Sequence, residues 1–138
     1  MTGTDRARVI LRWLLAAAYL FVGYVHLRSP GGFIPIVPDW VPYPRETVLL
    51  TGVCEIAGAI GLMTRRFCYA AGIGLAAYAV CVYPANIKHA MEGVTVSGVQ
   101  LGWAYHAPRL AFQPVIVWWA LFAGGITRWP FGGKDTAR

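Results

Sequence analysis

The chain has 138 residues, of which 57% are apolar and only 13% are charged. This charge content is about half that of a typical soluble domain, and the high apolar fraction excludes an intrinsically disordered chain. The net charge of +6 comes from short basic groups between apolar runs, so nucleic acid is not an expected partner, and three cysteines are too few for a disulfide-stapled scaffold.

Four apolar segments, residues 9–27, 48–64, 67–85 and 110–127, are each close to the length that a helix needs to cross a bilayer. These segments are apolar all round, which disfavours a soluble bundle because no face is left for water. No small-residue cleavage site follows the first segment, so we interpret it as a retained span. The sequence therefore predicts an all-α, integral membrane four-helix bundle, a single domain over residues 1–138 that is surrounded by the lipid bilayer.

The basic residues predict the orientation of this bundle, because Lys and Arg accumulate on the cytoplasmic side of a membrane protein. Eight fall on the side of the termini and four on the other, which predicts cytoplasmic N and C termini in a bacterial inner (plasma) membrane. The eight are Arg6, Arg8, Arg12, Arg65, Arg66, Arg128, Lys134 and Arg138, and the four are Arg28, Arg45, Lys88 and Arg109.

The two outer connections are longer than the inner link, which is only Arg65-Arg66. The first, between spans one and two, contains five prolines, which deny it a regular helix. It also contains apolar residues such as Phe33 and Trp40, so we expect it to lie in the membrane interface or to fold back over the bundle as a cap. The second, residues 86–108, is polar and contains glycine, and it is predicted to be a loop.

Glu55 is the clearest ionisable residue inside a predicted span. Such a residue costs roughly 2.5–3.5 kcal/mol on insertion scales and therefore usually has a partner and a purpose. Gly52, Gly58 and Ala59 share its helical face, so this face is expected to point into the bundle. Two hypotheses stay open for Glu55: a functional group, such as a proton carrier, ligand anchor or metal ligand, and a structural ion pair.

Polar residues gather at the outer ends of all four predicted spans and are almost missing from the inner halves. They are His26, Glu55, Asn86, Arg109 and Gln113. This asymmetry predicts one ligand-binding or buried polar cluster that opens toward the outer side. The aromatic residues expected to line the apolar part of the site are Trp40, Tyr83, Trp103 and Tyr105. Glu55 and Arg109 are expected to be partners, directly or through one hydrogen-bonding residue.

Metal and thiol chemistry have less support in the sequence. His26, His89 and His106 all fall on the outer side, but their spacing matches no tight metal-binding motif, so no metal site is predicted. Cys54 and Cys81 lie in outer halves and are close enough in depth to approach each other. They are either a redox pair or small buried apolar residues, and both alternatives stay open.

Five short motifs follow one another along the chain. They are G-Y-V-H at 23–26, I-V-P-D-W-V-P at 36–42, G-V-C-E-I-A-G at 52–58, Y-P-A-N-I at 83–87 and R-L-A-F-Q-P at 109–114. In this order, over about residues 9–129, they resemble the small four-helix DoxX-like membrane proteins. The chain departs from a frequent R-L-P-x-Q pattern of those proteins at Ala111, which affects only the local start of span four.

The resemblance implies two classes of function. The DoxX-like family is similar to a membrane subunit of a thiosulfate:quinone oxidoreductase, other members are tied to oxidative-stress complexes, and a eukaryotic branch acts as a receptor-assembly chaperone. The resemblance also places the family's polar positions on His26, Glu55, Asn86, Arg109 and Gln113. We therefore expect a redox-linked subunit that binds a quinone or a similar small apolar ligand at this cluster. The alternative is a non-catalytic assembly factor or chaperone whose cluster is structural.

Whether the protein is an enzyme stays open, because the sequence contains no visible nucleophile–base–orienter arrangement and no residue is assigned a catalytic role. Four short spans without an inverted repeat disfavour a transporter. A membrane or redox protein partner and a homo-oligomer are both compatible with the sequence.

Overall fold

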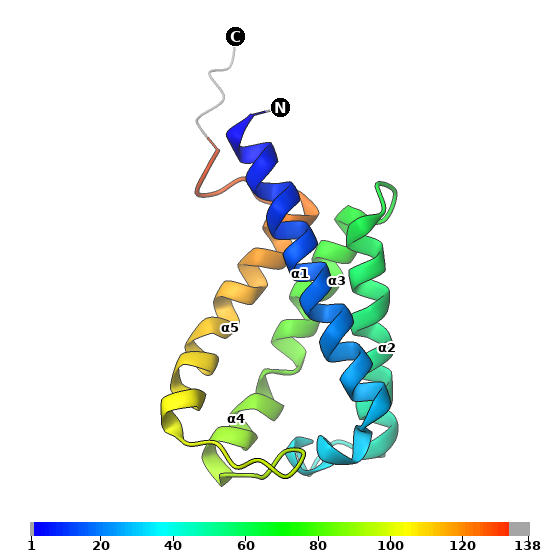
Figure 1. Cartoon of the computed structure of the whole chain (residues 1–138), viewed down its shortest axis with the longest axis vertical. Helices are drawn as coiled ribbons and strands as arrows, with labels where there is room; N and C mark the ends of the chain where they lie inside the picture. The colour runs from blue at the N-terminus through cyan, green and yellow to red at the C-terminus, as the bar shows by residue number, and fades with distance from the viewer. Residues whose placement is uncertain (1, 133–138) are drawn as a thin grey trace.

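The computed structural model describes residues 2–132, which fold into five α-helices and two single-turn 3₁₀ helices (Figure 1). The α-helices are α1 (Gly3–Arg28), α2 (Pro44–Met63), α3 (Cys68–Cys81), α4 (Tyr83–Glu92) and α5 (Trp103–Gly124), and the 3₁₀ helices are η1 (Pro30–Gly32) and η2 (Ile34–Ile36). The prediction of an all-α fold is confirmed. Two of the basic residues counted for orientation, Lys134 and Arg138, lie outside the described residues.

Three helical stretches within residues 2–132 are long and apolar enough to cross a membrane: α1, α2, and α3 with α4, which together cover Cys68–Glu92. The predicted fourth span lies in α5, which is not among them; its sequence includes Arg109, Gln113 and two prolines. Large apolar side chains cover the surface, and Trp13 and Phe21 are 56% and 68% exposed. These features indicate an integral membrane protein, in which lipid takes the place of water around the helices.

The helix bounds differ from the predicted spans for local reasons. α1 begins six residues before residue 9, because Thr2 and Asp5 form a capping box that satisfies its first N–H groups. The third predicted span is divided at Val82, just before Pro84, and continues as α4. The predicted loop at residues 86–108 is wrong, because both of its ends are helical and only residues 93–102 connect α4 to α5. Pro108, the last residue of the predicted loop, lies inside α5.

Close helix crossings rest on glycine. A Cβ atom on Gly23 of α1 would lie 2.8 Å from the Gly52 carbonyl oxygen of α2, so only glycine permits this approach. At the second crossing, a Cβ on Gly72 of α3 would lie 2.7 Å from the Cα of Gly124 in α5. As a result α1 packs along α2, and α3 packs along α5.

The helices converge at one end and diverge at the other (Figure 1). The convergent end carries the N-terminus, the α2–α3 link and the end of α5, and its core contains fully buried alanines, among them Ala16, Ala59 and Ala123. At the divergent end the α1–α2 connection lies beside the α4–α5 connection. The separation of the helices at this end leaves room for a pocket.

The connection between α1 and α2, residues 29–43, covers the divergent end, and we call it the cap. Phe33 packs edge-on against the His26 ring, with 4.3 Å between ring centroids, while Ile36 and Val37 are buried. The Lys88 ammonium of α4 donates to the Val37 carbonyl at 2.9 Å and to the Asp39 carboxylate at 2.7 Å. The segment therefore folds back over the bundle as a cap, which is one of the two arrangements expected for it.

Candidate functional site

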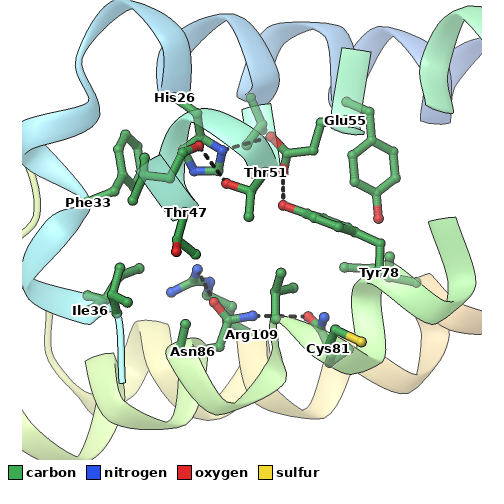
Figure 2. Close-up of a pocket in the computed structure, with 18 of the residues that line it drawn as sticks. His26, Phe33, Ile36, Thr47, Thr51, Glu55, Tyr78, Cys81, Asn86 and Arg109 are labelled. Atoms are coloured by element: carbon green, nitrogen blue, oxygen red, sulfur yellow. Dashed lines mark hydrogen bonds and ion pairs between the residues drawn. The ribbon is translucent and has the colours of Figure 1, made fainter. Parts of the chain in front are cut away.

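A pocket of about 560 Å³ lies under the cap, with walls from α1, α2, α4, α5 and the end of α3 (Figure 2). Most of its surface is apolar, from residues such as Val22, Val48, Phe112 and Ile116. The structure brings the whole predicted polar cluster to this one pocket. The lining includes His26, Glu55, Asn86, Arg109 and Gln113.

Glu55 forms the polar centre of one wall. Its side chain is almost fully buried, with 3% of the residue exposed, and both carboxylate oxygens have partners. His26 Nδ1 lies 2.7 Å from Oε2, and the Tyr78 hydroxyl donates to Oε1 at 2.7 Å. Three helices, α1, α2 and α3, therefore contribute to one hydrogen-bonded group, which satisfies a carboxylate that would otherwise be costly to bury.

The glycine crossing explains why His26 reaches Glu55. His26 lies three residues after Gly23, and Glu55 lies three residues after Gly52, so each polar side chain shares a helix face with its glycine. A Cβ on Gly23 would lie 3.1 Å from the Cβ of Glu55, and one on Gly52 would lie 3.0 Å from the Cβ of His26. The crossing therefore brings the two side chains into contact.

Arg109 forms the polar centre of the opposite wall and is half-buried (Figure 2). Its guanidinium donates through Nη2 to Asn86 Oδ1 at 2.6 Å and through Nη1 to His89 Nδ1 at 2.9 Å. Because arginine has no acceptor, this contact makes His89 Nδ1 the acceptor and leaves the His89 proton on Nε2. Both partners of Arg109 are thus neutral in this arrangement.

Two backbone interruptions position the polar groups of this second wall. Gln113 accepts from the Asn86 amide at 3.3 Å and donates to the Ala79 carbonyl, next to the α3–α4 break, at 2.6 Å. Pro114 has no N–H for the Leu110 carbonyl one turn earlier, and the Tyr83 hydroxyl donates to that carbonyl at 3.3 Å instead. Pro114 thus frees a carbonyl group that a side chain of α4 then satisfies, and Gln113 joins α5 to the last part of α3.

The expected partnership of Glu55 and Arg109 does not occur. Within residues 2–132, the Glu55 carboxylate contacts His26 and Tyr78, and Arg109 contacts no carboxylate. No single residue hydrogen-bonds to both of them, because Asn86 and Gln113 lie on the Arg109 wall and His26 lies on the Glu55 wall. Both residues line the same pocket, but they lie on opposite walls of it.

Of the four aromatic residues expected along the apolar part, only Trp40 lines the pocket. Tyr83 is turned to the Leu110 carbonyl, and Trp103 is 55% exposed in the first turn of α5. Tyr105 is also exposed, with its ring 5.7 Å from the Arg109 guanidinium carbon. The helical start of α5, which the sequence analysis did not predict, turns these last two residues away from the pocket.

Sequence reasoning missed Tyr78 and assigned His89 and His106 to a loop. Tyr78 was detectable as a hydroxyl-bearing residue in an otherwise apolar span, where it needs a partner. His89 and His106 are helical and nearly fully buried, at 4% and 2% exposure, with 4.6 Å between their ring centroids. His89 contacts the Arg109 guanidinium through Nδ1 and therefore helps to hold it in place.

Metal ligands and a thiol pair do not account for the pocket. Residues 2–132 contain no group of three or more His, Cys, Asp or Glu side chains arranged to hold a metal ion. Cys54 and Cys81 are free thiols and both are exposed, so the alternative of two small buried residues is wrong. Cys81 does contribute to the pocket lining.

The arrangement offers two kinds of hydrogen bonding across an apolar space. The Glu55 carboxylate and its neighbour Thr51 present acceptor oxygens, while Arg109 keeps N–H donors beyond the two that Asn86 and His89 occupy. Such a pocket suits a mostly apolar molecule with polar atoms at its edges, since few and well-placed polar groups orient a ligand in an apolar cavity.

Comparison with known proteins gives one match. The sequence model of a domain of unknown function, DUF8561, matches residues 15–124, which include every residue that lines the pocket. The match carries no assignment to the DoxX-like proteins. No curated protein and no solved structure matches the chain.

Proposed function

The chain belongs to the DUF8561 family, whose function is unknown, and from its pocket we propose that it binds a small, mostly apolar membrane ligand, such as a quinone. The observation that carries the proposal is one apolar cavity with Glu55 and Arg109 on opposite walls. The volume of about 560 Å³ lies within the range of roughly 300–1,000 Å³ that is typical of small-molecule sites.

A quinone head fits the donors and acceptors that line this cavity. Its carbonyl oxygens accept hydrogen bonds, and Arg109 has donors that its neighbours Asn86 and His89 do not use. The hydroxyl groups of the reduced form would donate to Glu55 or to the Thr51 oxygen. The resemblance to DoxX-like proteins supports a quinone as the ligand and a redox-linked subunit as the role of the chain.

We also propose that α5 is the fourth span and that both termini are cytoplasmic, in a bacterial inner membrane. Figure 1 supports this topology, because the N-terminus, the Arg65-Arg66 link and the end of α5 lie at the same end of the bundle. The cap and the α4–α5 connection lie at the other end, which is the outer end in this topology. The pocket therefore belongs to the outer half of the bundle.

The test is to purify the protein in detergent and identify bound small molecules by extraction and mass spectrometry. Titration with a short-chain benzoquinone should then quench the fluorescence of Trp40 and Trp119, which both line the pocket. Arg109→Gln should weaken binding roughly tenfold or more, because a hydrogen bond from a charged donor contributes about 1.5–3 kcal/mol.

The matched control is Arg65→Gln, which removes an exposed arginine at the convergent end and should leave binding unchanged. Protein that carries no extractable ligand and shows no quenching would contradict the proposal. If that protein also retains a partner protein through purification, the assembly-factor alternative is favoured.

A further inference from the structure

The cap covers the outer end of the pocket in part, and its Trp40, which lines the pocket, is itself 75% exposed. Ile36 and Val37 of the cap are buried over the pocket, and Lys88 binds the cap through the Val37 carbonyl and the Asp39 carboxylate. A second contact joins the cap to the α4–α5 connection, where the Ser97 amide donates to the Gly32 carbonyl at 3.3 Å. A molecule that arrives from the aqueous side would have to displace the cap.

The side of the pocket, in contrast, is open between α1 and α5. Ala18 and Val22 of α1 and Phe112 of α5 line the pocket and are also exposed at the surface. Nearer the convergent end the two helices are joined, because the Trp119 indole donates to the Leu11 carbonyl and Arg12 donates to the Ala123 carbonyl, each at 2.9 Å. Below these contacts α1 and α5 separate (Figure 1).

The surroundings of this opening are apolar. Along α1, Leu14 and Phe21 are 54% and 68% exposed, and Val115 of α5 is 41% exposed. α1 is a candidate membrane span. Only 17% of its most apolar stretch is buried in the protein, so most of the surface of α1 is left for lipid. The opening thus lies in the band of the surface that acyl chains would cover.

We infer that the ligand is a membrane lipid with a long apolar tail, which reaches the pocket sideways from the bilayer through the opening between α1 and α5. This inference rests on the proposed function and adds the chemical class of the ligand. The polar head lies between Glu55 and Arg109, and the tail occupies the opening beside Ala18, Val22 and Phe112. In the opening, apolar side chains take the place of the hydrocarbon around the tail. The tail therefore moves from the bilayer into the protein without entering water.

The experiment measures binding of two quinones to the protein in lipid nanodiscs, from tryptophan quenching at known quinone-to-lipid ratios. One benzoquinone carries a decyl chain and the other carries a methyl group in its place. Ala18→Phe places a ring in the opening, and the matched control is Ala17→Phe, since Ala17 is exposed on α1 but does not line the pocket. Asp39→Ala removes one of the two contacts between Lys88 and the cap.

Lateral access predicts that Ala18→Phe weakens decyl-quinone binding at least tenfold, that Ala17→Phe does not, and that Asp39→Ala leaves the binding rate unchanged. If both quinones bind the wild-type protein equally and Ala18→Phe matches Ala17→Phe, the inference is overturned while the proposed function stands. Faster binding by the Asp39→Ala variant would also overturn it, because that result places the route through the cap. If neither quinone binds the wild-type protein, the proposed function fails first, and the inference fails with it.

Discussion

Glu55 and Arg109 face the same cavity without pairing with each other, and each is held by side chains of its own wall. Glu55 contacts His26 and Tyr78, whereas Arg109 contacts Asn86 and His89. A direct ion pair would have joined the two walls and filled the space between them. Because each charge is satisfied locally, the cavity stays open and the remaining donors and acceptors are available to a ligand.

This relationship predicts which residues are energetically coupled. Glu55→Gln combined with His26→Gln should lose less stability than the sum of the single variants, with a coupling of about 0.5–3 kcal/mol, as is usual for residues in direct contact. Glu55→Gln combined with Arg109→Gln should be closer to additive. Denaturation of the wild-type protein, the three single variants and the two double variants in detergent measures both couplings, and equal couplings would contradict the two-wall description.

The α1–α2 crossing predicts a large effect for a single methyl group. Gly52→Ala would place a Cβ 3.0 Å from both the Gly23 carbonyl oxygen and the His26 Cβ, so the helices must separate. We expect a loss of about 1–3 kcal/mol in stability, the usual cost of overpacking, and weaker contact between His26 and Glu55. Thermal unfolding in detergent measures the first effect, and quinone quenching measures the second.

The control for this variant is Gly74→Ala in α3, where nothing lies within 4 Å of the added atom. Alanine costs less backbone entropy than glycine in a helix, so this variant should unfold at the same temperature or higher. A Gly52→Ala protein as stable as the Gly74→Ala protein would show that the crossing tolerates a wider separation.

Tyr83 should contribute to stability through the carbonyl that Pro114 leaves free. Tyr83→Phe removes the hydroxyl that donates to Leu110 and should cost about 1–3 kcal/mol, the penalty for an unsatisfied buried acceptor. In a Pro114→Ala background the helix regains its own N–H donor, so the same substitution should cost less. Chemical denaturation of the four proteins tests this, with Tyr69→Phe, an exposed tyrosine of α3, as control.

The proposed topology predicts which segments are reachable from outside the cell. In a chain with Cys54, Cys68 and Cys81 replaced by serine, a cysteine at Thr95 in the α4–α5 connection should react with a membrane-impermeant maleimide in intact cells. A cysteine at Arg65 should react only after the membrane is opened. The reverse pattern would show that the termini lie outside.

The sequence was sufficient for the helical class and for the polar cluster, because both depend on where polar residues interrupt apolar runs. It was insufficient for the pairing within the cluster. Glu55 and Arg109 were assigned to each other by depth and charge, yet pairing depends on the direction of each helix face, which Gly23 and Gly52 set by a contact between helices. The burial of His89 and His106 was missed because the polar, glycine-containing segment indicated a loop, although both of its ends are helical.

The cap has a consequence for hydration at the boundary between lipid and water. Proline has no N–H group, so each of the four prolines of the cap, from Pro30 to Pro42, removes one donor that water would otherwise have to satisfy. Several remaining donors bond within the segment: Phe33 to Pro30, Val37 to Ile34 and Val41 to Pro38. The backbone of this segment therefore leaves fewer N–H groups that need a hydrogen bond from the solvent. An irregular segment can then lie over an apolar cavity. An ordinary loop in the same place would have backbone N–H groups with neither water nor a protein acceptor to bind.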